Sequence, residues 1–156
     1  MKNQKVLIIG PPFSGKSYIS SKLKEKGVNA IDADKIDSLS KWVNENGDTV
    51  QFPDSASQDW LSENKFVWDR EVLENFLGKE ELPVYVFGVS SNVFYLKDLF
   101  DKSFFLEMSP QLLLKRMSNN KRTNPRGNTE EQRNALIESL QKKKEKALSY
   151  GFIPIP

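Results

Sequence analysis

The sequence predicts an α/β fold in which a parallel β-sheet lies between helices. The main observation is three segments with the pattern of buried strands, at residues 6–9, 83–88 and 102–107. Apolar runs rich in β-branched and aromatic residues are typical of strands that are covered on both faces. Helical patterns separate these segments, and strands that alternate with helices form parallel sheets. A length of 156 residues is near the modal domain size, so we expect one domain over residues 1–156.

In the first half of the chain, a short helix follows the first strand, because apolar residues recur at helical spacing up to Gly27. A short second strand ends at Asp32-Ala33-Asp34. Asp34 is expected to be the N-cap of a helix whose apolar residues continue at helical spacing as far as Gly47. Residues 49–64 predict a loop and a short helix, and the apolar stripe over residues 65–78 predicts a longer helix.

The second half continues the alternation. A short helix is expected after the strand at residues 83–88, and Ser109-Pro110 then supplies the N-cap and first residue of another helix. Thr129 and Gln132 form a capping box for a long helix to Tyr150. Residues 152–155 predict a last strand, placed at a sheet edge by its proline.

The segment between the first strand and the first helix carries the clearest functional pattern. Residues 10–17, Gly-Pro-Pro-Phe-Ser-Gly-Lys-Ser, match the phosphate-binding sequence G-x-x-x-x-G-K-[ST] at every fixed position. Unpaired backbone N–H groups and the helix dipole would converge on a phosphate there. Lys16 would reach the β- and γ-phosphates, and Ser17 would bind Mg²⁺. The residues expected to bind nucleotide here are Gly10, Pro11, Pro12, Phe13, Ser14, Gly15, Lys16, Ser17 and Tyr18. A chance match in a surface turn is the alternative, and the flanking strand and helix argue against it.

Composition excludes several kinds of chemistry. The chain has no cysteine and no histidine, which removes disulfides, thiolate or histidine metal sites, and catalysis by either side chain. General acid–base work must therefore fall to Asp, Glu, Lys or Tyr. The 23 Lys and Arg balance 21 Asp and Glu, so we expect no bulk nucleic-acid or membrane partner. A cytoplasmic protein, as a monomer or homodimer, is the expectation.

Two carboxylates follow the second strand and are the best candidates for acidic chemistry. Ligands of open parallel sheets bind beyond the carboxyl ends of the strands, where these acids meet the phosphate loop. The third strand ends in Phe87-Gly88 without an acid, so Asp32 is expected to hold Mg²⁺. Asp34 is expected to accept the proton of a substrate hydroxyl, although a capping role alone would also account for it.

These motifs resemble the small P-loop kinases related to adenylate, shikimate and gluconate kinases. The resemblance implies a three-layer α/β/α kinase-like domain with about five parallel strands in the order 2-3-1-4-5, and ATP and Mg²⁺ as cofactors. Asp32-x-Asp34 resembles the shikimate-kinase pair that serves Mg²⁺ and the acceptor hydroxyl. Arg70 resembles the arginine that clamps the acceptor, and Gly88-Val89-Ser90 lies where these kinases keep a glycine-rich turn against the substrate.

The resemblance extends to the second half of the chain. Arg116 resembles the arginine of a Leu-x-x-Arg helix that packs near the adenine, and residues 118–128 resemble a short lid. An arginine there would stabilise the transferring phosphoryl group; the alternative is an ordinary surface charge on a loop. We prefer Arg122 as the catalytic residue, with Arg126 second, and expect both to contact the nucleotide. Phe13 stands where adenylate kinases carry glycine, which argues against a nucleoside-monophosphate kinase.

The leading hypothesis is therefore a kinase that phosphorylates a small metabolite held by residues 34–78. Trp42, Trp60 and Trp68 fall in this region and either wall the acceptor pocket or pack beneath a long connection. A regulatory P-loop ATPase without a small acceptor is the second hypothesis, and a degenerate nucleotide-binding module is the third. A GTPase is disfavoured, because Thr123 stands where guanine recognition needs a carboxylate.

Overall fold

The computed structural model describes residues 4–11, 14–118 and 130–155. Its main sheet has five strands, all paired in parallel, in the order β2-β6-β1-β7-β8. In the chain order of these five strands this is 2-3-1-4-5, which confirms the predicted topology. The strands are β1 (Lys5–Ile9), β2 (Ala30–Asp32), β6 (Val84–Phe87), β7 (Lys102–Leu106) and β8 (Ile153–Ile155).

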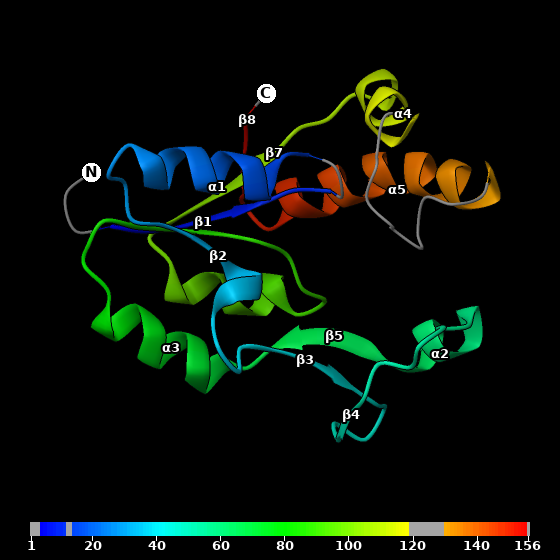
Figure 1. The fold of residues 1–156 in the computed structure, drawn as a ribbon, viewed down its shortest axis with the longest axis horizontal. Coiled ribbons are helices and arrows are strands. Elements are labelled where there is room, and N and C mark those ends of the chain that lie inside the picture. Colours follow the sequence, from blue (N-terminus) through cyan, green and yellow to red (C-terminus); the bar gives the residue numbers. More distant parts are fainter. Residues whose placement is uncertain (1–3, 12–13, 119–129, 156) are drawn as a thin grey trace.

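Helices cover both faces of this sheet, as Figure 1 shows. The helices are α1 (Lys16–Glu25), α2 (Gln58–Glu63), α3 (Arg70–Lys79), α4 (Pro110–Ser118) and α5 (Glu130–Ser149), with 3-10 helices η1 (Ala33–Lys35) and η2 (Val93–Leu99). Val6 and Ile8 of β1 pack towards Ile19 of α1 on one face. Their neighbours in β1 point to the other face, where the core includes residues of α3, η2 and the end of α5. The predicted three-layer architecture is therefore confirmed.

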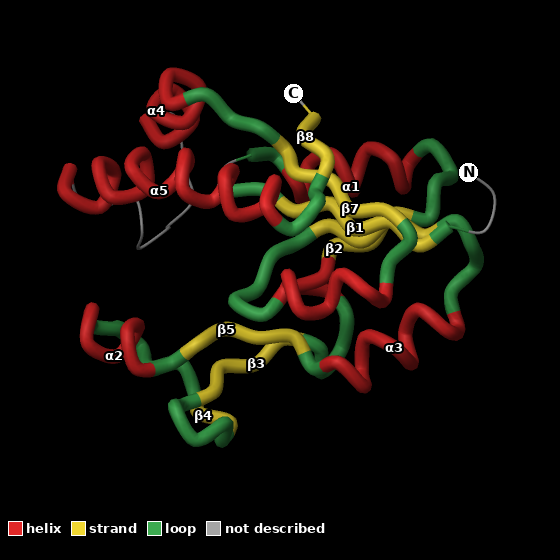
Figure 2. Tube along the Cα trace, turned by 180° about the vertical axis from the view of Figure 1, so that it is seen from behind, coloured by secondary structure: helices red, strands yellow, loops and turns green. Residues whose placement is uncertain are grey.

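A second sheet was not expected. It is antiparallel, in the order β4-β3-β5, and consists of β3 (Ser40–Val43), β4 (Thr49–Val50) and β5 (Lys65–Trp68). Figures 1 and 2 show it on the same side of the main sheet as α3. The helix predicted from Asp34 to Gly47 is therefore wrong, and the helix predicted over residues 65–78 is right only from Arg70 onwards.

The turn between β3 and β4 explains the first error. The side chain of Asn44 accepts hydrogen bonds from the backbone N–H groups of Asn46 and Asp48, both at 3.0 Å. Gly47 has a φ of 83°, a left-handed conformation that favours glycine. Asn44 and Gly47 thus reverse the chain after β3, where the sequence prediction took Gly47 as the end of a helix.

A capping carboxylate was also assigned to the wrong residue. Asp32, rather than Asp34, is the N-cap of η1, and its Oδ1 accepts a hydrogen bond from the backbone N–H of Asp34 at 3.0 Å. Asp69 performs the same role for α3, where its Oδ1 accepts from the N–H of Val72 at 3.1 Å. Asp34 therefore does not cap this helix, so the alternative explanation for this residue does not apply.

Candidate nucleotide and acceptor site

The phosphate loop connects β1 to α1, and its described residues adopt a tight turn. Ser14 donates its backbone N–H to the carbonyl of Pro11 at 3.2 Å, and Gly15 has a φ of 93° immediately before α1. A Cβ at Gly10 would lie 2.8 Å from Oγ of Ser14, so a side chain there would displace the loop. Pro12 and Phe13 lie outside the described residues. The glycines thus allow the chain to turn closely into the N-terminus of α1, where anions bind.

Lys16 reaches back over this loop. Its Nζ donates hydrogen bonds to the carbonyls of Gly10 at 2.7 Å and Pro11 at 2.9 Å, and to Oγ of Ser14 at 3.3 Å. The pKa of Lys16 is lowered to about 8, mainly by burial and then by the positive charge of Lys143, while the charges of Asp34 and Asp32 oppose the shift. The ammonium is therefore still largely protonated at neutral pH and is held at the centre of the loop.

Ser17, in the first turn of α1, meets Asp32 at the end of β2. The hydroxyl of Ser17 donates to Oδ2 of Asp32 at 3.0 Å, while the other carboxylate oxygen caps η1. The two side chains that were predicted to hold Mg²⁺ are thus in direct contact. Both offer oxygen, the donor that Mg²⁺ prefers, and Mg²⁺ commonly takes its remaining ligands from phosphates and water. The donor set therefore fits the ion.

Asp34 lies two residues beyond this pair, on the solvent-accessible side of η1. Partial burial raises its pKa above the usual value of 3.8, and the neighbouring charge of Asp32 raises it further, whereas Lys16 acts in the opposite direction. A carboxylate with a raised pKa and access to solvent is a better proton acceptor than an ordinary aspartate. Asp34 therefore has the properties expected of a general base.

The end of β6 approaches η1 and β5 very closely. A Cβ at Gly88 would lie 2.7 Å from Cβ of Ala33 and 2.9 Å from Cζ2 of Trp68. Trp68 is 1% exposed, and its indole N–H has no hydrogen-bond partner among the described residues. Gly88 was predicted to contact the substrate. Its clear role in the structure is to let the indole of Trp68 lie against the residue between Asp32 and Asp34.

The loop after β6 holds β5 in place. Oδ1 of Asn92 accepts from the backbone N–H of Trp68 at 3.0 Å, and its Nδ2 donates to the carbonyl of the same residue at 2.9 Å. The hydroxyl of Ser90, which was predicted to bind substrate, donates to Oδ1 of Asn92 at 2.8 Å. Ser90 is buried, so its hydroxyl orients Asn92. Sequence reasoning missed Asn92, although an Asn after a strand commonly bonds to nearby backbone.

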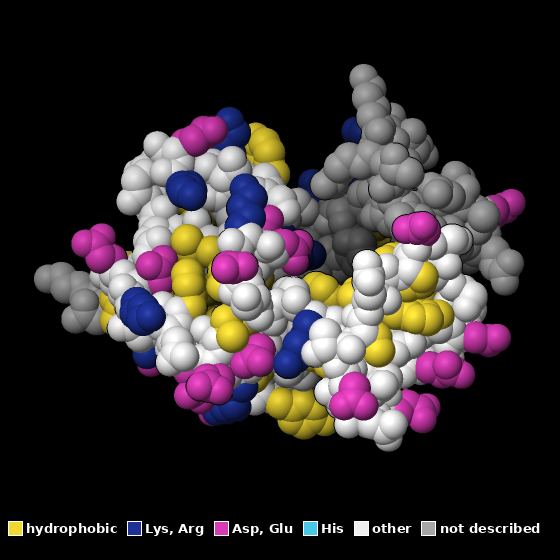
Figure 3. All heavy atoms as spheres, turned by 60° about the horizontal axis from the view of Figure 1, so that its bottom comes forward, with side chains coloured by type: hydrophobic (Ala, Val, Ile, Leu, Met, Phe, Trp, Pro, Cys, Tyr) yellow, Lys and Arg dark blue, Asp and Glu magenta, His cyan; other side chains and the backbone are white. Residues whose placement is uncertain are grey.

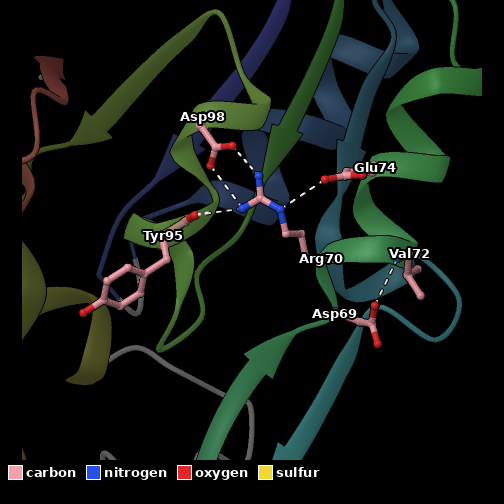
Figure 4. Close-up of polar contacts among 6 residues, drawn as sticks. All are labelled: Asp69, Arg70, Val72, Glu74, Tyr95 and Asp98. Atoms are coloured by element: carbon pink, nitrogen blue, oxygen red, sulfur yellow. Dashed lines mark hydrogen bonds and ion pairs between the residues drawn. The ribbon is translucent and has the colours of Figure 1, made fainter.

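Arg70, the predicted acceptor clamp, lies between α3 and η2 (Figure 4). Its Nε donates to Oε1 of Glu74 at 3.1 Å, and its Nη1 donates to the carbonyl of Tyr95 at 3.2 Å. The guanidinium also forms a two-point contact with the carboxylate of Asp98, which raises the pKa of Arg70 and lowers that of Asp98. Arg70 therefore links α3 to η2 at the surface. To bind an acceptor, its guanidinium would have to leave some of these partners.

Arg116 was predicted to pack near the adenine. A Cβ on Gly15 would lie 3.5 Å from its Nη1, so the guanidinium is next to the phosphate loop. Tyr18 is 68% exposed and contacts Lys22, with Nζ 5.7 Å from the ring centroid. The predicted lid arginines, Arg122 and Arg126, lie outside the described residues.

The tryptophans were predicted either to wall the acceptor pocket or to pack beneath a long connection, and their contacts favour packing. Trp68 belongs to the main core. Trp42 lies on the small sheet, with its ring centroid 5.1 Å from Phe52, 5.0 Å from Trp60 and 5.4 Å from Phe66. Since these rings contact one another, they join the segment after β4 and α2 to the face of the small sheet, as packing predicts.

No carboxylate follows β6, whose end reads Phe87-Gly88-Val89. Glu107 follows β7 instead, and its Oε1 lies 2.9 Å from Nζ of Lys144. The part of the chain that the structure describes contains no group of three or more acidic residues that could hold a metal ion. Asp32, which contacts Ser17, stays the predicted Mg²⁺ carboxylate. Among the described helices, none has both the length and the apolar composition needed to cross a bilayer.

Comparisons with known proteins agree with this geometry. A family described as "AAA domain" matches residues 6–137, which include the phosphate loop and both aspartates. Among curated proteins, none matches the chain. The crystal structure of a gluconokinase from Sinorhizobium meliloti 1021 has a similar fold, with a TM-score of 0.52 and 16% sequence identity. The similarity covers 98% of this chain and 82% of the gluconokinase chain. At this identity the likeness concerns the fold.

Proposed function

Because the chain belongs to the AAA-domain family of P-loop NTPases, we propose that it is a small-molecule kinase. It transfers the γ-phosphoryl group of Mg-ATP to a hydroxyl or phosphate of a small metabolite. The observation that supports this best is the contact between Ser17 and Asp32, with Asp34 two residues further on. A phosphate loop alone binds a triphosphate, whereas a second free carboxylate beside it offers a base for an acceptor.

The proposed roles follow from position and charge. Lys16 holds the outer phosphates, and Arg116 lies against the loop where it can contact the nucleotide. Mg²⁺, held through Ser17 and Asp32, would neutralise charge on the phosphate oxygens. The acceptor oxygen attacks the γ-phosphorus, the bond from that phosphorus to the β–γ bridging oxygen breaks, and ADP leaves. Asp34 takes the proton of the acceptor hydroxyl.

The acceptor itself is the least defined part of the proposal. Residues 34–78 build a small antiparallel sheet and a short helix beside the site, and these elements are proposed to hold it. Nucleosides, nucleotides, sugars and hydroxylated acids all fit the proposed chemistry. The gluconokinase likeness makes sugar acids a sensible first set to test. We further propose a monomer or homodimer that acts in the cytoplasm without a nucleic-acid or membrane partner.

The direct test is an acceptor screen that follows ADP release from Mg-ATP. Slow hydrolysis that one class of acceptor accelerates is expected, and Lys16→Ala should abolish it because the outer phosphates lose their cation. If no nucleoside, sugar, polyol or hydroxylated acid accelerates ADP release, the kinase proposal is wrong.

A second candidate is a nucleotide-binding or ATPase module without a small acceptor. The specific observation in its favour is the end of β6, where Gly88 and Val89 stand in place of an acid. In that case nucleotide binding would depend on Lys16, but Asp34→Asn would leave the rate of ADP release unchanged.

A further inference from the structure

Helix α5 passes beside the phosphate loop, and contacts of β7 establish this position. Cβ of Leu106, the last residue of β7, lies 3.1 Å from the place where a Cβ of Gly10 would be. The next residue, Glu107, forms an ion pair with Lys144 of α5, with 2.9 Å between Oε1 and Nζ. The part of α5 around Lys144 therefore lies at the edge of the sheet where the phosphate loop begins.

The helical repeat places Lys143 on the side of α5 that faces the body of the protein. Leu140 lies three residues before it and Ala147 four residues after it, and both are buried. Lys143 itself is exposed. The side chain of Lys143 thus starts from the inward side of the helix and is not enclosed there.

The charge of Lys143 acts on the loop lysine. The two ammonium groups are close enough for their positive charges to interact. Arg116 brings a further cation to Gly15 from α4. Positive side chains from three separate elements therefore gather around one loop, an arrangement that a polyanionic ligand would stabilise.

We propose that Lys143 contacts the outer phosphates of a nucleoside triphosphate bound at the phosphate loop. This inference rests on the proposed function, since it assumes that the loop binds nucleotide. It adds a residue of α5 to the proposed site residues, which otherwise come from the phosphate loop, η1 and α4. The ion pair of Lys144 with Glu107 is proposed to position Lys143, because it fixes the adjacent turn of α5.

The test compares Lys143→Ala with Lys142→Ala, which removes the same charge one position earlier, about 100° around the helix. Binding of a non-hydrolysable Mg-ATP analogue, Mg-ADP and AMP is measured by titration calorimetry at about 0.15 M salt, where distant surface charges are screened. For Lys143→Ala we expect affinity for the ATP analogue to fall by about tenfold or more, the size of one charge-assisted hydrogen bond. A smaller loss is expected for ADP and little change for AMP. Lys143→Arg should retain most of the affinity.

Two results would overturn the inference: an equal loss for all three nucleotides, or an equal effect of Lys142→Ala. Both leave the proposed function intact, because the unsubstituted protein still binds ATP. If the unsubstituted protein binds none of the three nucleotides, the proposed function fails and the inference fails with it. A thermal unfolding curve for each variant shows whether a loss of binding merely reflects a loss of folding.

Discussion

Replacing Gly88 by alanine tests the closest approach in the candidate site. The added Cβ would lie 2.7 Å from Cβ of Ala33 and 2.9 Å from Cζ2 of Trp68, both shorter than a normal contact. Ala33 and Trp68 are buried, so neither can move without disturbing its neighbours. Overpacking of this kind costs about 1–3 kcal/mol in the free energy of unfolding. In a protein of this size that lowers the melting temperature by roughly 2–12 °C.

A matched control is available within α3. Gly78→Ala makes the same chemical change, but nothing lies within 4 Å of the new Cβ. Because alanine favours helix, this variant should gain up to about 1 kcal/mol. Urea denaturation followed by circular dichroism measures both values. Adding Ala33→Gly to Gly88→Ala should recover part of the loss, since it removes the nearest atom. Equal stabilities for Gly88→Ala and Gly78→Ala would refute the steric argument.

The remaining predictions concern Asp34 and Asn92. Asp34→Asn should lower turnover far more than ATP affinity, and equal losses in kcat and nucleotide Kd would remove Asp34 from the acceptor role. Because the pKa of Asp34 is raised, turnover should fall as the pH drops through a value above the usual 3.8, which a pH–rate profile will show. The folded protein binds this proton more tightly than the unfolded chain does, so ionised Asp34 reduces stability above that pH window. Asp34→Asn should therefore not lower the melting temperature at neutral pH, and a clear decrease would contradict the assigned shift. Asn92→Ala leaves the N–H and C=O of Trp68 without their side-chain partner, which should cost about 1–3 kcal/mol for each buried group that water cannot reach. Asn92→Asp keeps the acceptor and loses the donor, so its unfolding midpoint should lie between those of Asn92→Ala and the unsubstituted protein. Identical midpoints for the two variants would show that only the bond to the carbonyl matters, because Asn92→Asp retains the bond to the N–H.

The parts of the fold that follow from local sequence were predicted correctly. The run before Gly10, the loop and the start of α1 each depend on neighbouring residues, so periodicity and glycine placement were sufficient. The predicted strand order also agrees with the observed one. That prediction came from the resemblance to a kinase family with this topology. The meeting of Ser17 and Asp32 follows from the topology, since Asp32 ends β2 and Ser17 lies in the first turn of α1, at the same edge of the sheet.

The small sheet could not be predicted in the same way. Trp42 and Phe66 face each other across β3 and β5, 24 positions apart in the chain, and that pairing decides the structure of both segments. Taken alone, each segment has apolar residues that also suit one face of a helix, so a periodicity argument chose the wrong element. The decisive local features were Asn44 and Gly47, which form a turn rather than a helix end.

The proposed acceptor region and the proposed catalytic carboxylates are connected through Trp68 in this fold. Trp68 is the last residue of β5, and its indole lies against Gly88 beside Ala33, the residue between Asp32 and Asp34. A ligand that displaces the small sheet must therefore move Trp68 or bend β5, since Asn92 holds the backbone of Trp68 at both its N–H and its carbonyl. Rigid attachment at this point favours an acceptor that fits a preformed surface, because reorganisation would disturb both the carboxylate proposed to hold Mg²⁺ and the proposed base. Selectivity would then arise from the outer part of the small sheet, and the chemistry from its junction with β6.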